Sequence, residues 1–228
     1  NKEQQPNQWE ALKDYIVNKN PKKLGINISS FEPLADGLSK YHYDQLYKIL
    51  PQKFKKRIVS AEDLAIAWIE TRTELEMTVY SQLVEISSSI IREAFSTKVI
   101  TPGITSTDDV VWWMREKVLE LGLQTWFHPT VDVQRKDDSD LYAFDNKSKL
   151  DIIQPGDLIH CDFGISYLTL NTDTQELGYI LKPGEKNAPD FLIDAMSQGN
   201  RVQDILTNNF KYGATGNEIL KKSLEQGK

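Results

Sequence analysis

The stretch LIHCDFG, residues 158–164, places an acidic side chain, Asp162, inside an otherwise apolar run that is typical of a β-strand. A second acid, Asp173, follows eleven residues later within LNTDTQ, residues 170–175, at a spacing that suits a hairpin. A buried carboxylate is unfavourable unless a cation or hydrogen bonds compensate its charge. Two such carboxylates on one face therefore predict a site for hard, divalent metal ions.

The register of this hairpin decides whether the two acids meet. A reversal between Tyr167 and Leu168 would set Asp162 opposite Asp173, with their side chains about 4.5–5.5 Å apart. Like charges in that position destabilise a strand pair unless a cation bridges them, and the pair could hold one metal ion or two ions about 3.5–4 Å apart. The alternative is two ordinary turn aspartates, because residues 166–169 contain no Asn-Gly turn former.

Composition excludes several classes of protein. With 39% hydrophobic and 26% charged residues, the 228-residue chain has the composition of an ordinary globular protein. Its net charge of −6 offers no basic face for nucleic acid, and no run approaches the roughly 18 apolar residues of a membrane span. The single cysteine, Cys161, excludes an internal disulfide framework.

The two ends of the sequence are expected to be cut. The chain starts at Asn1 without an initiator Met, and it ends at Lys228, soon after the last apolar residue of an expected helix. A leader removed from the protein would leave no trace here. The sequence therefore does not decide the cellular location: the protein is cytoplasmic, or it is exported after removal of a signal peptide.

Residues 1–72 have the pattern of an incomplete α/β domain followed by a linker. LGINIS, residues 24–29, alternates like a strand, and a helix is expected over residues 38–50. A second short strand is expected over residues 57–60, and a helix over residues 61–70. These elements are too few for a complete doubly wound domain.

Residues 73–228 carry longer elements. The expected order is a helix after Thr73, a helix from Thr107 to Gly122, strands over 125–133, 157–163 and 167–181, a helix after Pro189 and a helix capped by Thr215 and Glu218. The helix after Pro189 should bury Leu192, Ala195, Val202, Leu206 and Phe210. The polar segment 135–149 is expected to be an exposed loop. Helices that flank antiparallel strands favour an α+β layer.

Four motifs in order then resemble the pita-bread metallopeptidases: ITPGITSTDDV (100–110), TWFHPTV (125–131), IQPGDLIHCDFG (153–164) and NTDT (171–174). This family includes Xaa-Pro aminopeptidases, prolidases, methionine aminopeptidases and creatinase, and the aminopeptidase P and prolidase branch is the most similar. The resemblance implies that residues 73–228 form the N-terminal half of a pita-bread catalytic domain, with helices packed on a curved antiparallel sheet. Residues 1–72 would be the C-terminal part of that branch's N-terminal α/β domain, plus a linker.

The resemblance also implies a metal site and a reaction. Asp162 would chelate one divalent metal ion and Asp173 would bridge two, which could be Mn, Co or Zn. The other three ligands of the family, one His and two Glu, would lie beyond Lys228 together with the catalytic residues. In the family a metal-bridging hydroxide attacks the peptide carbonyl. The intact protein would then cleave proline-containing peptides as an aminopeptidase or dipeptidase, and it could be a homodimer. The 228-residue chain alone, without the other ligands, would be inactive.

Two departures from the family pattern favour a rival function, a non-catalytic pita-bread module that binds peptides or protein partners. Residues 133–146 contain no His of the kind that contacts substrate in active members. Gln175 and Glu176 occupy the stretch in which the family has Thr-Arg. Against this rival stand Asp162 and Asp173, which keep the spacing of the family.

Two histidines are further candidates. His160 lies two residues before Asp162, hence on the same strand face, where it could support a metal-binding carboxylate or serve as a polar packing residue. His128 precedes Pro129 and could point into the cleft or be a satisfied strand histidine. Cys161 alternates to the opposite face and is expected to be a small core residue.

Overall fold

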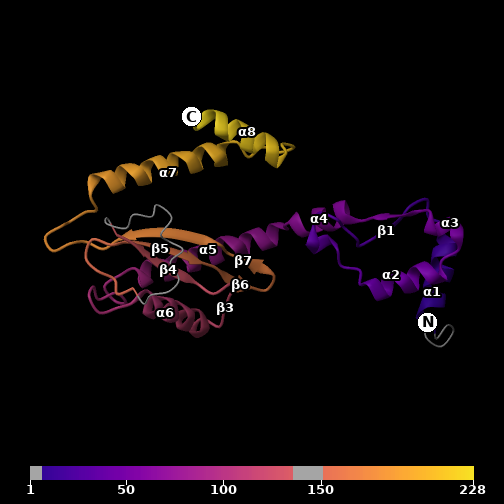
Figure 1. Ribbon diagram of the computed structural model, residues 1–228, viewed down its shortest axis with the longest axis horizontal. Coiled ribbons are helices and arrows are strands. Elements are labelled where there is room, and N and C mark those ends of the chain that lie inside the picture. The colour runs from indigo at the N-terminus through magenta and orange to yellow at the C-terminus, as the bar shows by residue number, and fades with distance from the viewer. Residues whose placement is uncertain (1–6, 136–150) are drawn as a thin grey trace. The chain divides into compact units, whose positions relative to one another are not determined.

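The computed structural model describes residues 7–135 and 151–228 (Figure 1). The expected loop at 135–149 lies outside the described residues except for its first residue. The chain divides into two compact units, Asn1–Glu74 and Leu75–Lys228. Within the described ranges, no helix is both long and apolar enough to cross a membrane.

The first unit is built on a short parallel strand pair. β1 (Leu24–Ile26) pairs with β2 (Ile58–Ser60), and the two short strands expected from the sequence are thus confirmed. Parallel strands need a long crossover, which runs here through α2 and α3. The helices are α1 (Gln8–Lys19), η1 (Pro33–Ala35), α2 (Lys40–Ile49), α3 (Gln52–Lys55) and α4 (Glu62–Glu70). The core contains Ile16, Ile26, Leu46, Leu50 and Phe54.

Two helices open the second unit. α5 (Glu74–Ala94) buries residues three or four positions apart, which form one face: Leu83, Ser87, Ile90, Ile91 and Ala94. α6 (Thr107–Glu120) begins at a capping box, in which the Asp109 N–H donates to Ser106 Oγ (3.1 Å) and the Ser106 N–H donates to the Asp109 carboxylate (2.8 Å). Gly122 follows the helix with φ of 70°, as a C-terminal stop should.

The described strands of the second unit form two three-stranded antiparallel sheets. The central sheet has the order β4-β5-β8, and the smaller sheet has the order β3-β6-β7. The central strands are β4 (Thr130–Gln134), β5 (Leu158–Phe163) and β8 (Thr174–Tyr179). The smaller strands are β3 (Gln124–Thr125), β6 (Ile165–Tyr167) and β7 (Leu170–Asn171).

The single strand expected over residues 125–133 is therefore wrong. The chain leaves β3 after Thr125 and enters β4 at Thr130, so the intervening residues 126–129 connect two different sheets. Pro129, which is fully buried, lacks the N–H that a continuous ladder would need. The aromatic-x-Pro motif thus marks a break between strands.

The core of the second unit lies between the central sheet and the two helices that precede it. Ile159, Cys161 and Phe163 of β5 are fully buried and pack in one cluster with α5 and α6. The opposite face of β5 is left for Leu158, His160 and Asp162, because side chains alternate along a strand. Burial is thus confined to one face of β5 and leaves the face of Asp162 available to a site.

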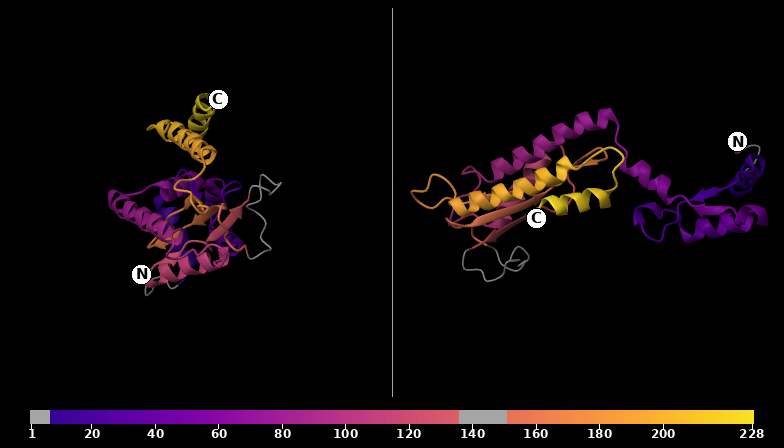
Figure 2. Two further views of the ribbon diagram at one scale, coloured as in Figure 1. Left: turned by 90° about the vertical axis from the view of Figure 1, so that its left-hand side faces the viewer. Right: turned by 90° about the horizontal axis from the view of Figure 1, so that it is seen from above.

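Two helices follow the sheet and lie side by side (Figure 2). α7 (Asp190–Asn208) starts after Pro189, and α8 (Gly216–Gln226) starts at the expected capping box. Asn209 is buried at the end of α7, where its side-chain amide donates to Ile205 O, Ser223 Oγ and Gln226 Oε1. These hydrogen bonds tie the end of α7 to α8.

The expectation that α7 buries an apolar face is wrong. Val202 is 58% exposed and Leu206 39%, and none of the α7 residues is fully buried against the described part of the chain. Phe210 lies beyond the end of α7 and is 65% exposed. The periodicity of a sequence shows that a helix has an apolar face. It cannot show whether anything covers that face.

Candidate functional site

The candidate site lies on the open face of the central sheet. On β5 this face carries Asp162 and His160. Across the ladders, Asp162 lies between Thr130 of β4 and Gln175 of β8, while His160 has Leu177 as its β8 partner. The strand alternation expected from the sequence thus sets both candidate residues on one face.

The expected pairing of the two acids is wrong. Asp162 lies opposite Gln175, because the chain reverses one residue later than expected, with Tyr167 paired to Leu170. Leu168 adopts the left-handed conformation (φ 55°) that lets a two-residue turn close the hairpin. Moving the reversal by one residue shifts each partner by two positions, so the face of every side chain is kept.

Asp173 still lies near Asp162, although it belongs to no strand. It is exposed in the short connection between β7 and β8. Burial first, and then the charge of Asp173, raise the pKa of Asp162, and the nearby His160 partly offsets this rise. The structure therefore brings the two predicted acids together through a bend in the hairpin.

The bend depends on Gly164 and Thr172. The Ile165 N–H donates to Thr172 Oγ1 (3.0 Å), and the Thr172 N–H donates to Ile165 O (2.9 Å). Thr172 is fully buried, and a Cβ on Gly164 would overlap its carbonyl oxygen. These contacts hold the segment just before Asp173 against the end of β5.

The Asp162 carboxylate has one oxygen left to bind a ligand. Oδ2 accepts a hydrogen bond from Gln175 Nε2 (3.4 Å), whereas Oδ1 is buried without a hydrogen-bond partner among the described residues. A buried acceptor without a partner is costly, and carboxylate oxygens are the ligands that hard divalent cations prefer. Asp162, with Asp173 beside it, therefore fits part of a metal site.

The described residues do not complete that site. No group of three or more His, Cys, Asp or Glu side chains gathers there, or elsewhere in residues 7–135 and 151–228, with the geometry to hold a metal ion. Sites that bind divalent ions through protein side chains generally use three or more ligands. Two carboxylates alone would hold a cation weakly.

The two candidate histidines have different surroundings. His160 shares a hydrogen bond of 3.2 Å between its Nε2 and Gln175 Oε1. His128 is exposed and contacts α6: its Nδ1 lies 2.8 Å from Arg115 Nη1, and its ring meets that of Trp112 edge-on, with 6.3 Å between centroids. His160 is thus linked to Asp162 through Gln175, while His128 is held against α6.

Cys161 is unsuited to nucleophilic chemistry. Burial above all, then the negative charges of Asp162, Glu176 and Asp132, raise the pKa of its thiol to about 12. A thiol with that pKa stays protonated at neutral pH, and the thiolate is the reactive form. The sequence expectation of a small core residue is confirmed.

An ion pair, which sequence reasoning missed, anchors the start of β5. Asp157 is 3% exposed, and its carboxylate accepts two hydrogen bonds from Arg135 (2.9 and 3.0 Å) and one from the Gln154 N–H (2.8 Å). Arg135 also donates to Ile152 O (2.8 Å). Because Asp157 immediately precedes β5, these bonds fix where the strand that carries Asp162 begins.

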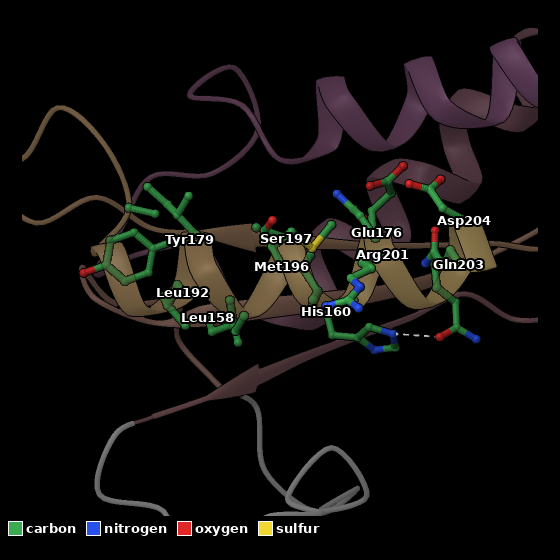
Figure 3. A pocket seen from close by; sticks show the side chains of 18 residues that line it. Leu158, His160, Glu176, Tyr179, Leu192, Met196, Ser197, Arg201, Gln203 and Asp204 are labelled. Atoms are coloured by element: carbon green, nitrogen blue, oxygen red, sulfur yellow. Dashed lines mark hydrogen bonds between the residues drawn. The ribbon is translucent and has the colours of Figure 1, made fainter. Parts of the chain in front are cut away.

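A cavity of about 1040 Å³ extends from the site between the sheet and α7 (Figure 3). Its walls are mainly apolar, with Leu158, Leu177 and Tyr179 on the sheet and Leu192 and Met196 on α7. His160 and Gln175 line it as well, which joins the cavity to the hydrogen bonds around Asp162. The sequence did not predict this cavity. Its apolar pattern over α7 predicts a buried helix face, whereas in the structure part of that helix lines the cavity.

Comparisons with known proteins agree on the fold. The model of metallopeptidase family M24 matches residues 79–225, which is more than half of the chain. An X-Pro aminopeptidase from Thermotoga maritima MSB8 has a similar structure, with a TM-score of 0.66 and 15% identity. A putative aminopeptidase P from Bacillus anthracis (0.64, 15%) and the prolidase from Pyrococcus horikoshii OT3 (0.59, 18%) are also similar. No curated protein matches the sequence significantly.

The matched lengths are unequal. The three alignments cover 96%, 96% and 95% of this chain but 56%, 50% and 55% of the respective solved chains. The chain thus spans about half the length of the structures it matches. At these low identities the likeness shows the fold alone, and the α+β, pita-bread fold expected from the sequence is confirmed.

Proposed function

Because the chain belongs to metallopeptidase family M24, we propose that the intact protein is a metal-dependent peptidase of the Xaa-Pro aminopeptidase or prolidase type. Its substrates would be proline-containing peptides. Family membership supports the metallopeptidase activity. The preference for proline is supported by the names of the similar structures, an X-Pro aminopeptidase and a prolidase among them.

The observation that carries the proposal is the state of the Asp162 carboxylate. One of its oxygens is buried without a partner among the described residues, and burial, followed by the charge of the second acid, Asp173, raises its pKa. Both features are unfavourable for an ionised carboxylate in the chain alone. A divalent cation shared by the two carboxylates would relieve both.

The chain's own residues would supply part of the metal site. Asp162 and Asp173 would each offer carboxylate oxygens to Mn, Co or Zn, and Gln175 would hold Asp162 Oδ2 by its hydrogen bond. Bound there, the metal would supply a water activated for attack on a peptide carbonyl. By family resemblance, the remaining ligands would be one His and two Glu from sequence beyond Lys228.

A second candidate function is a non-catalytic module that binds peptides or protein partners. It is favoured by the replacement of the family's Thr-Arg by Gln175 and Glu176. The mainly apolar cavity of about 1040 Å³, which His160 and Gln175 help to line, would suit a peptide in either case. Hydrolysis is therefore the property that separates the two candidates.

Metal content and hydrolysis test the proposal on the intact protein. After purification with Mn²⁺, we expect a stoichiometric divalent metal and cleavage of Xaa-Pro peptides, and both should fall at least about tenfold in Asp162→Asn, which weakens a metal ligand. Asp132→Asn is the matched control, since this acid lies on the same sheet face but outside the proposed ligand set. A wild-type protein that takes up no divalent metal would contradict the proposal. Peptide binding without hydrolysis would favour the module.

A further inference from the structure

Gln175 lies at the centre of a hydrogen-bonded chain on the open face of the sheet. Its Nε2 lies 3.4 Å from Asp162 Oδ2, and its Oε1 lies 3.2 Å from His160 Nε2, the contact drawn as a dashed line in Figure 3. The β5–β8 register places Gln175 directly across from Asp162. One exposed side chain thus connects two half-buried polar residues of the neighbouring strand.

The chemistry of the three groups fixes the direction of this chain. An ionised carboxylate only accepts hydrogen bonds, so the amide of Gln175 must turn its NH₂ group toward Asp162. Its carbonyl oxygen, which also only accepts, then faces His160. His160 Nε2 must therefore carry a proton and donate it to Gln175.

A shorter side chain could not make both contacts. His160 and Asp162 are two residues apart on β5, which corresponds to about 6.6 Å along a strand. The amide of glutamine offers a donor and an acceptor on separate atoms, whereas a hydroxyl group has one oxygen for both purposes. Gln175 occupies the stretch in which Thr-Arg is expected from the family pattern, so this link is a feature of this chain's own sequence.

We propose that Gln175 is a positioning residue that couples His160 to Asp162. It holds His160 as an Nε2 donor and restrains Asp162 through Oδ2, which leaves Oδ1 directed to a cation. The second part rests on the proposed function, because it assumes that a divalent cation binds Asp162. The first part does not depend on a metal.

The first experiment follows the His160 Nε2–H in the metal-free, 228-residue chain by ¹⁵N-edited NMR. The chain has three histidines, and His160→Gln assigns the signal. A hydrogen-bonded imidazole N–H exchanges slowly with water, so we expect a visible signal in the wild type and its loss in Gln175→Leu. Gln175→Glu should keep the signal, since a carboxylate can still accept from His160. An equally visible signal in Gln175→Leu would overturn the proposal.

The second experiment measures the Mn²⁺ affinity of the intact protein, and of the same variants made in it, by water proton relaxation. Loss of a residue that orients a metal ligand typically changes affinity about 10–100-fold, so we expect weakening of that size in Gln175→Leu. Leu177→Ala, a change on the same face of β8 opposite His160, is the control and should alter neither readout. Unchanged affinity in Gln175→Leu would overturn the coupling to Asp162. A wild type that binds no Mn²⁺ would contradict the proposed function but not the hydrogen bond between His160 and Gln175, because the NMR experiment tests that bond in the absence of metal.

Discussion

Gly164 is the residue on which the geometry of the acidic pair depends most directly. A Cβ at this position would overlap the Thr172 carbonyl oxygen and lie 2.8 Å from Phe127 Cε1. The missing side chain therefore lets the chain after β5 pack closely against the segment that leads to Asp173. The same close approach explains why the hairpin bends at this point and divides into strands of two sheets.

Gly164→Ala should therefore destabilise the protein by about 1–3 kcal/mol, the usual cost of overpacking a close contact. Urea denaturation followed by tryptophan fluorescence would measure it. Gly199→Ala is the matched control, because a Cβ there meets nothing within 4 Å and Gly199 lies inside α7. That change should be neutral or stabilising by roughly 0.5–1 kcal/mol, as alanine favours helix. Equal costs for the two variants would contradict the steric argument.

At the scale of elements, capping boxes fix where the helices that follow turns begin. Ser106 and Asp109 bond reciprocally at the start of α6, and Thr215 and Glu218 do the same for α8. Hydrogen bonds from the Ser106 backbone and then from its side chain lower the pKa of Asp109. The start of α6 matters to the site because the buried face of this helix packs beneath the central sheet.

The cap of α6 should be visible in stability and in its pH dependence. Ser106→Ala should cost about 0.5–2 kcal/mol at neutral pH, the usual loss for a serine N-cap. Because the folded pKa of Asp109 is below its unfolded value, its contribution is present above the unfolded pKa and is lost as pH falls through the folded pKa. The difference in unfolding free energy between wild type and Asp109→Asn should therefore shrink in acid. Asp108→Asn, in the same turn but outside the box, should show a smaller effect at every pH.

At the scale of the whole molecule, the second unit has one covered and one open sheet face. α5 and α6 bury the core side of β5, while α7 lies across a cavity from the other side and keeps much of its apolar face exposed. The buried side carries the stability of the unit. The open side carries the candidate site.

Truncations on the two sides should separate these contributions. Ile91→Ala removes a fully buried side chain of α5 and should cost about 2–5 kcal/mol. Val202→Ala removes a side chain of α7 that is 58% exposed and should stay within about 0.5 kcal/mol of the wild type. Chemical denaturation of the 228-residue chain would check both. A large cost for Val202→Ala would mean that the face of α7 is covered in solution.

The candidate site was only partly predictable from the sequence. The strand around Asp162, the face shared with His160 and the burial of Cys161 all follow from alternation, a local property. The partner of Asp162 does not follow, because it depends on a turn at Leu168 that carries no glycine or asparagine signal. For the same reason the sequence did not predict that Gln175 contacts Asp162 and His160, or that Arg135 pairs with Asp157.

The sequence by itself determined the succession of the helices in the second unit, the cap of α8 by Thr215 and Glu218, the α+β class and the two acids at family spacing, because these depend on neighbours a few residues apart. The tertiary structure alone decided the register that sets Gln175 opposite Asp162, the break between β3 and β4, and the exposure of the α7 face. Each of these depends on which distant segments meet. Contact between distant segments is fixed by packing and turn geometry, which local patterns do not encode.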